Sequence, residues 1–183
     1  MATTETRDIL DLLAADHQLV EERFTTLDSA HATDRHSLFC ELVHTLVGHE
    51  VAEELVVYPA IVHDAPDGEA EAKPRLEEQA EAEQKLADME KMDPASPEFG
   101  AQLAQLKSAV LAHAKAEEAR IFPLLRQVET PASRAEMADR YQRAKDKAPT
   151  HPHPHSPDTP PGNKLLGSVA ALFDKARDAV KNA

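Results

Sequence analysis

Two segments of this chain share one spacing of side chains that bind metals. His49 is followed four residues later by Glu53, and His113 is followed four residues later by Glu117. Residues four apart on a helix lie on one face, with Cβ atoms about 5–6 Å apart, so each pair could bind a common metal ion. Two such faces that meet inside a bundle of helices would form a binuclear metal site.

Helical periodicity predicts the elements that must position these pairs. Apolar residues recur at helical spacing along four segments, which capping and turn residues separate. The predicted helices cover about residues 6–30, 35–63 and 74–92, with a fourth that begins at Pro97 after a cap at Ser96. Helices of this length with short connections favour an all-α, up-down-up-down four-helix bundle.

Three prolines bear on the boundaries and bends of these helices. Pro74 suits the first turn of the third predicted helix, where an amide hydrogen would have no intrahelical partner. Pro59 and Pro123 each lie ten residues after a histidine of the repeated spacing. An interior proline kinks a helix, but a bend at these two positions would leave the ligand-bearing turns intact.

The apolar stripes predict that the polar pairs face the core. His49, for example, continues the stripe of Leu42 and Leu46. Each predicted helix carries one such inward pair: His17 with Glu21, His49 with Glu53, Gln79 with Glu83, and His113 with Glu117. A single inward histidine is commonly a hydrogen-bonded core residue, but buried charges in this number call for a cation. We therefore favour a metal site.

The composition disfavours several other classes of function. The formal net charge of −13 disfavours nucleic acid and anionic membranes, whose phosphates bind clusters of Lys and Arg. Cys40 is the single cysteine, so no intrachain disulfide can form and a reducing compartment is compatible. No apolar run approaches the roughly 18 residues of a membrane span. No Ser/His/Asp constellation, phosphate loop or cysteine cluster is found. We expect a soluble, cytoplasmic protein.

The C-terminal part of the chain differs in composition from the rest. We divide the chain into the four-helix bundle at residues 1–128, an additional helix at 129–148, a Pro/His-rich linker at 149–163 and a C-terminal amphipathic helix at 164–183. The alternating tract from His151 to His155 could bind a transition metal, but a proline-stiffened connector is the favoured role. The apolar face of the last helix could pack on the bundle, join a second subunit or lie on a membrane, in that order of preference.

Together, these residues resemble the hemerythrin-like, or HHE cation-binding, proteins. The resemblance covers about residues 6–128 and rests on Asp16-His17 followed by the two His-x3-Glu spacings in order. It implies a four-helix bundle around a non-haem di-iron centre, with two iron ions bridged by an oxo group or by carboxylates. By the resemblance, the positions that match metal ligands are His17, His49, Glu53, His113 and Glu117. Glu53 and Glu117 are the candidates to bridge the two irons.

The third predicted helix departs from the family pattern. Family members commonly have histidine there, whereas this chain has Gln79 in the inward phase and Glu83 one turn later, with Glu81 as the alternative if the helix is rotated. Carboxylate in place of imidazole makes a site harder and more anionic, which favours the ferric state. Glu83, together with Glu21, would shift the centre toward a di-iron carboxylate type and toward redox turnover rather than reversible oxygen carriage. Tyr58 could add a nearby hydroxyl or a further ligand.

Three classes of function remain, in order of preference. The resemblance implies a di-iron redox protein that binds or reacts with dioxygen, hydrogen peroxide or nitric oxide, with a role in oxidative stress. Whether it is an enzyme stays open, and turnover would take the form of catalase-like or other peroxide- or oxygen-reducing activity. The second class is an iron or oxygen sensor, or an iron store, that acts through a partner without turnover. The third is a metal-free helical interaction module. The expected partners are small molecules rather than nucleic acid or membrane, and a homodimer or a partner bound by the tail stays open.

Overall fold

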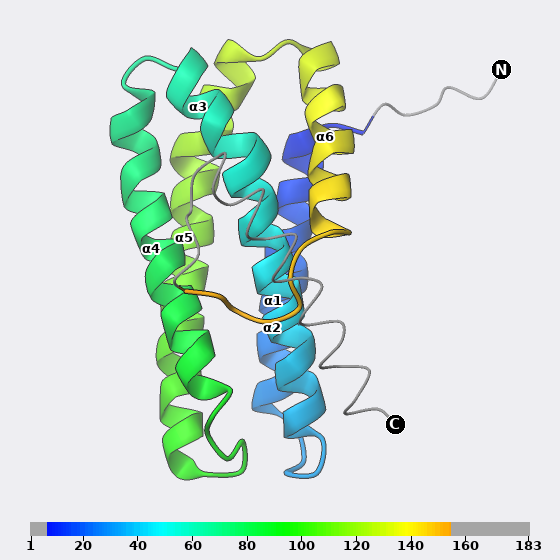
Figure 1. Cartoon of the computed structure of the whole chain (residues 1–183), viewed down its shortest axis with the longest axis vertical. Helices are drawn as coiled ribbons and strands as arrows, with labels where there is room; N and C mark the ends of the chain where they lie inside the picture. The colour runs from blue at the N-terminus through cyan, green and yellow to red at the C-terminus, as the bar shows by residue number, and fades with distance from the viewer. Residues whose placement is uncertain (1–6, 155–183) are drawn as a thin grey trace, which may run out of the picture.

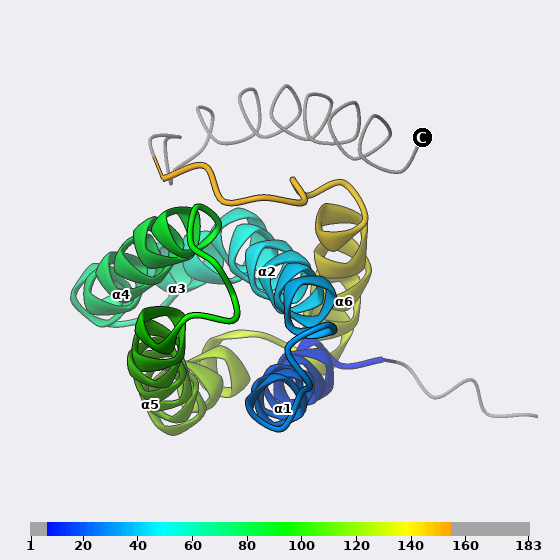
Figure 2. The same cartoon turned by 90° about the horizontal axis from the view of Figure 1, so that it is seen from below.

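The computed structural model describes residues 7–154, which form helices and no strands (Figure 1). Four long helices run alternately up and down: α1 (Ile9–Asp28), α2 (Arg35–Ala52), α4 (Gly68–Met89) and α5 (Pro97–Val128). Two shorter helices accompany them: α3 (Tyr58–Asp64) and α6 (Pro131–Lys145). Seen along the bundle axis, the long helices occupy four corners, and α6 packs beside α1 and α2 (Figure 2). The predicted all-α, up-down-up-down bundle with an additional C-terminal helix is confirmed.

Capping residues begin two of the helices at the places that the sequence indicates. Ser96 accepts a hydrogen bond at 3.1 Å from the backbone N–H of Phe99, and Pro97 occupies the first turn, so the predicted start of α5 is confirmed. Thr130 caps α6 in the same way, because its hydroxyl accepts a hydrogen bond at 3.1 Å from the backbone N–H of Ser133. Local signals therefore fix where these two helices begin.

The start of α4 differs from the prediction. The helix begins at Gly68, so Pro74 lies inside it and its predicted place in the first turn is wrong. Asp67 adopts a left-handed conformation with a φ of 55°, which turns the chain directly from α3 into α4. At Gly68 a Cβ atom would lie 1.9 Å from the carbonyl oxygen of Ile61. Glycine therefore allows a close approach of α4 to α3 that a larger residue would block. This tight turn starts the helix well before Pro74.

A π-helical turn, η1 (Glu53–Val57), interrupts the second predicted helix. Helix α2 ends at Ala52, and α3 begins at Tyr58, whose backbone N–H bonds to the carbonyl oxygen of Glu53. Pro59 follows in the first turn of α3, where it lacks the amide hydrogen that a continuous α-helix would use. The irregular turn thus includes Glu53, whereas the sequence predicted a bend that leaves the ligand-bearing turn intact. Single π-helical turns are frequent at functional sites.

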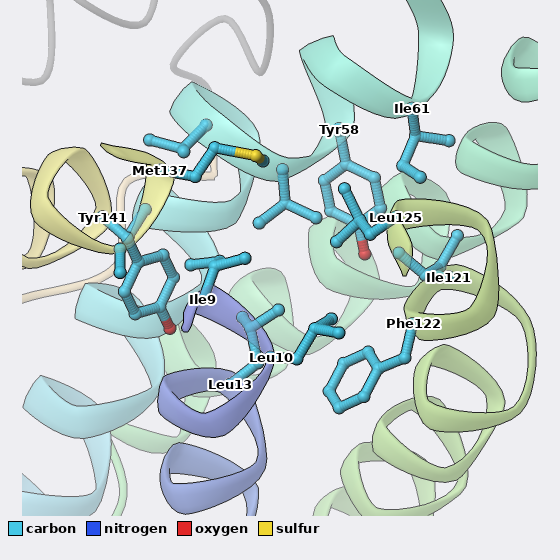
Figure 3. Close-up of a cluster of buried hydrophobic side chains, with 14 of the residues drawn as sticks. Ile9, Leu10, Leu13, Tyr58, Ile61, Ile121, Phe122, Leu125, Met137 and Tyr141 are labelled. Atoms are coloured by element: carbon cyan, nitrogen blue, oxygen red, sulfur yellow. The ribbon is translucent and has the colours of Figure 1, made fainter. Parts of the chain in front are cut away.

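Two clusters of buried apolar side chains lie on either side of a polar layer. The cluster toward the α1–α2 and α4–α5 connections includes Val20, Phe24, Leu42, Leu46, Leu86, Phe99 and Val110. The cluster toward α3 and α6 includes Leu13, Tyr58, Ile61, Ile121, Leu125, Met137 and Tyr141 (Figure 3). On α1, His17 lies between Leu13 of one cluster and Val20 of the other. The apolar packing thereby holds the polar layer at the middle of the bundle.

The described residues cover only part of the C-terminal region. Helix α6 lies within the range predicted for the additional helix, and residues 149–154 follow it without helical structure. The rest of the linker and the predicted helix at 164–183 lie outside the described residues, so the division of the chain into four parts stays a prediction. Within residues 7–154, the helices are too short or too polar to cross a membrane.

Candidate metal centre

Side chains from four elements meet in the polar layer between the two apolar clusters. One ligand atom of each lies within 4.8 Å of the others: His17 of α1, His49 of α2, Glu53 of η1 and Glu117 of α5. All four side chains are buried. His113 of α5 borders this group, because its Nε2 atom lies 3.3 Å from Oε1 of Glu117. The structure thus brings together the five positions that the family resemblance indicates.

Glu117 connects the two halves of this polar group. Its Oε2 atom lies 3.2 Å from Nε2 of His17, while its Oε1 atom faces His113 and accepts a hydrogen bond from the Tyr58 hydroxyl. Burial would raise the pKa of the Glu117 carboxyl, but the imidazoles of His113 and His17 hold that pKa below its usual range. Burial and the charge of Glu117 instead raise the pKa of Glu53. Without a cation, the layer stabilises only one of these two carboxylates in its charged form.

Each histidine of the group is oriented through its Nδ1 atom. The Nδ1 partners, at 2.7–2.9 Å, are Glu118 for His17, Tyr141 for His49 and Glu78 for His113. A carboxylate only accepts hydrogen bonds, so the Nδ1 atoms of His17 and His113 carry hydrogens. In metal sites, such a bond at one ring nitrogen fixes the orientation of the ring and leaves the other nitrogen to the metal.

Three buried atoms of the group lack a hydrogen-bond partner among the described residues: Nε2 of His17, Nε2 of His113 and Oε2 of Glu117. The two Nε2 atoms lie 3.2 and 3.3 Å from oxygens of Glu117, but without the geometry of hydrogen bonds. Buried nitrogen and oxygen atoms almost always have such partners. Imidazole nitrogens and carboxylate oxygens that converge without hydrogen bonds fit a bound cation.

On the third long helix, α4, Gln79 is the predicted candidate that reaches the group. It is buried, and its side-chain amide donates a hydrogen bond to Glu53 at 2.6 Å. Glu83 is half-buried and accepts a hydrogen bond at 2.7 Å from the backbone N–H of His153, in the segment that follows α6. Glu81 is exposed. The structure therefore places an amide, rather than Glu83, where the sequence left the ligand on this helix open.

Glu21 does not join the group. It is exposed on the outer side of α1, beside the polar residues Gln18 and Thr25. Although it stands four residues after His17, the buried stripe of α1 continues through Val20, so Glu21 falls on the solvent edge. His17 lies near the edge of the buried face of α1, so a residue four positions later falls outside that face. The spacing of four residues alone therefore does not bring Glu21 into the group.

Asp16 lies at the opposite edge of the buried face of α1, and the sequence predicts no separate role for it. Asp16 is buried there because α6 covers it: the Tyr141 hydroxyl donates a hydrogen bond to Asp16 at 2.6 Å, and Lys145 donates to both carboxylate oxygens at 2.6 Å. The available signal was the position of Tyr141 beside Met137 and Ala138 on the buried face of α6. A buried tyrosine needs a partner for its hydroxyl, so its presence points to a polar group nearby.

A cavity of about 470 Å³ adjoins the group between α4 and α5. Its lining includes His17, His49 and His113 together with apolar side chains such as Val20 and Leu106. The lining also includes exposed residues, so the cavity reaches the surface. Its volume is ample for small molecules to approach the three imidazoles.

Comparisons with known proteins agree with this fold. Residues 8–125 match the model of the family described as the hemerythrin HHE cation-binding domain. The chain is 28% identical over 175 residues to an uncharacterised hemerythrin-like protein of Schizosaccharomyces pombe, which covers 94% of this chain and 86% of that protein. It is also 28% identical over 141 residues to a Nostoc protein named DNA nickase, covering 76% of this chain but only 40% of that protein. The crystal structure of a hemerythrin HHE cation-binding domain-containing protein from Mycobacterium kansasii superposes with a TM-score of 0.67 at 20% identity, covering 76% of this chain and 86% of that one.

Proposed function

This chain belongs to the hemerythrin HHE cation-binding family, and we propose that it is a non-haem di-iron protein that binds or reacts with dioxygen, hydrogen peroxide or nitric oxide. The observation that carries the proposal is the buried carboxylate of Glu117, whose two oxygens face the unpartnered Nε2 atoms of His17 and His113. A carboxylate in such a place can bridge two metal ions inside a helical bundle. We place the protein in the cytoplasm.

The donor set defines which residues would hold the metals. His17, His49, Glu53 and Glu117, together with His113, would hold the metals. Imidazole and carboxylate donors suit iron, manganese and zinc, and membership of the family favours iron. A pair of bound irons would supply the electrons for the reduction of dioxygen or peroxide.

The residues around the donors would orient the ligands and admit the substrate. Glu78 and Glu118 hold the rings of His113 and His17 through their Nδ1 atoms. The Tyr58 hydroxyl holds a proton next to Glu117. The cavity between α4 and α5 would admit a small molecule to the imidazoles, and its apolar lining residues would limit the water that follows. Glu53 and Glu117 keep carboxylate oxygens among the donors, and no imidazole comes from α4, where Gln79 stands. Because carboxylate donors make a site harder and favour the ferric state, we favour redox turnover, such as catalase-like decomposition of peroxide, over reversible oxygen carriage.

Metal content tests the proposal directly. Plasma mass spectrometry and a visible spectrum of the untagged protein should give about two irons per chain and near-ultraviolet charge-transfer bands. The double variant His49→Ala, His113→Ala should lose both signals. Its matched control is His44→Ala, His63→Ala, which removes two exposed histidines and should retain them. Absence of metal from the wild type after anaerobic reconstitution with ferrous iron would refute the proposal.

A second candidate is an iron or oxygen sensor, or an iron store, that acts through a partner without turnover. The contact between His49 and Tyr141 favours this second candidate, because α6 connects the polar layer to the C-terminal part of the chain. The two candidates differ in kinetics. A redox enzyme should decompose many equivalents of hydrogen peroxide per chain, whereas a sensor or store should react about once and then stop.

A further inference from the structure

The Nδ1 atom of His49 contacts α6 rather than a surface glutamate. It lies 2.7 Å from the hydroxyl of Tyr141, and both side chains are buried. Asp16 Oδ2 is also near, but at 3.5 Å from the same Nδ1 atom it is too far for a good hydrogen bond. The hydroxyl of Tyr141 is therefore the direct partner of the His49 ring.

The hydrogen-bond directions in this contact follow from the chemistry of the groups. A phenol has one hydrogen, and Tyr141 gives it to Asp16 at 2.6 Å because a carboxylate can only accept. The oxygen of Tyr141 must then accept from Nδ1–H of His49. This assigns the hydrogen of the neutral ring to Nδ1 and leaves the lone pair of Nε2 on the side of Glu53, 3.4 Å away.

Asp16 is itself held from the surface side. Lys145 donates to both of its carboxylate oxygens at 2.6 Å, and the Lys145 side chain is only 21% exposed. His49, Tyr141, Asp16 and Lys145 thus form one connected network, which we call the α6 network. It joins α2, α6 and α1, and α6 begins after residue 125, where the match to the family model ends.

The other two histidines have no comparable support. The Nδ1 partners of His17 and His113 are Glu118 and Glu78, whose side chains are 48% and 40% exposed. Water can replace such partners, whereas a buried acceptor that is lost leaves an unpaired N–H in the protein interior.

We propose that Tyr141 and Asp16 are positioning residues that fix the His49 ring for metal binding, with Lys145 holding Asp16 in place. The inference deepens the proposed function and rests on it. It makes α6 a working part of the metal centre, although α6 supplies no ligand. A hydrogen bond from the distal nitrogen of a ligating histidine raises its donor strength, and loss of such a partner typically weakens metal binding about 10–100-fold.

The test compares Tyr141→Phe with Met137→Ala in the full chain. Met137 is buried on the same face of α6 but belongs only to the apolar cluster. Metal dissociation constants are measured by chelator competition, with ferrous iron under anaerobic conditions and with zinc. Tyr141→Phe should weaken metal binding about 10–100-fold, while Met137→Ala should lower the melting temperature and leave binding within about twofold of the wild type.

Two further readouts separate positioning from packing. The midpoint potential of the iron-loaded protein should rise in Tyr141→Phe, because a weaker imidazole donor stabilises ferric iron less, and should stay unchanged in Met137→Ala. In the zinc-loaded protein, the exchange-protected Nδ1 proton of His49 should give a downfield NMR signal that Tyr141→Phe removes or shifts.

The outcomes distinguish this inference from the proposed function. A wild type that binds metal, with unchanged affinity and potential in Tyr141→Phe, would overturn the role of the α6 network alone. Equal losses in Tyr141→Phe and Met137→Ala would reduce Tyr141 to a packing residue and overturn it too. A wild type that binds neither iron nor zinc would overturn the proposed function and this inference together.

Discussion

The polar layer has two ends, one at His49 and one at His113, which share the His-x3-Glu spacing. The two ends differ in the residues that support the histidine. Each histidine precedes a buried glutamate by four residues, and each Nε2 atom lies 3.3–3.4 Å from that glutamate. Behind His49 lies the buried α6 network, whereas behind His113 lies Glu78, half in solvent and paired with Arg75 at 2.5 Å. Exposed ion pairs contribute about 0–1 kcal/mol, while buried hydrogen-bonded networks contribute more and fail more sharply. A repeated sequence therefore does not produce two equal half-sites.

The protonation of the two imidazoles differs in the same sense. Burial lowers the pKa of His49, and Asp16 does not fully offset it. Burial would also lower the pKa of His113, but Glu117 and Glu78 outweigh it and raise that pKa above its usual value. In the metal-free protein burial thus favours the neutral form of His49, whereas the neighbouring carboxylates favour the protonated form of His113.

The largest expected effect concerns the number of metal ions. His113→Ala should retain about one ion per chain, because the group of His17, His49, Glu53 and Glu117 remains. Glu117→Ala removes the carboxylate that both ends share and should abolish binding of both ions. Plasma mass spectrometry after ferrous reconstitution measures this, with circular dichroism to verify folding. If His113→Ala loses both ions, the two ends act as one unit and the comparison fails.

The second effect is on the stability of the metal-free protein. Tyr141→Phe leaves a buried N–H of His49 without its acceptor and should lower the free energy of unfolding by about 1–3 kcal/mol. Glu78→Gln, at the His113 end, should change the free energy of unfolding by less than about 0.5 kcal/mol, because Glu78 is partly exposed. Urea denaturation of both variants at pH 7 provides the measurement. Equal losses would mean that the two supports are energetically alike.

The third effect is a dependence of stability on pH that has opposite signs at the two ends. Because the pKa of His113 is raised, its stabilisation is present below about pH 6.5 and is lost as the pH rises through the folded-state value. Burial would raise the pKa of Asp16, but His49, Lys145 and Tyr141 lower it, so its stabilisation is present above about pH 4 and is lost as the pH falls.

Urea unfolding of the metal-free protein across the pH range checks both signs. Glu78→Gln should flatten the decline above neutrality, and Asp16→Asn should flatten the decline in acid. A variant that flattens the other limb would show that the assignment of the two ends is reversed.

The smallest expected effect lies outside both ends. Glu21→Gln should leave metal content unchanged and stability within about 0.5 kcal/mol, because Glu21 is exposed on the outer side of α1. Its matched variant, Glu53→Gln, makes the same chemical change inside the layer and should reduce metal content. A loss of metal in Glu21→Gln would return this residue to the candidate ligands.

Much of the fold follows from local patterns in the sequence. Apolar stripes predict the four long helices, and Ser96-Pro97 predicts the start of α5 to the residue. The same reasoning fails at α4, because the left-handed Asp67 and the close approach at Gly68 are tertiary features that Pro74 does not signal. Hydrophobic periodicity indicates which face of a helix is buried, but not how short the turn between two successive helices is.

The candidate site divides in the same way. Spacing and phase predict the group that contains His17, His49 and Glu117, because their positions depend only on helices that face one core. The sequence predicts that Glu21 faces the core, but Glu21 is exposed, because the edge of a buried face depends on which neighbour covers it. Asp16 is buried at the opposite edge since α6 packs there, and that contact joins residues more than a hundred positions apart. Such partners follow from topology, which one sequence does not specify.

The π-helical turn makes the length of its segment part of the site. An α-helix advances about 100° per residue, so deletion of a single residue between Glu53 and Tyr58 would rotate α3 by about that angle relative to α2. Such a deletion would carry the Tyr58 hydroxyl away from Glu117 and turn Ile61 out of the apolar cluster. Natural insertions and deletions in relatives should therefore avoid this segment and accumulate in the connections at the ends of the bundle.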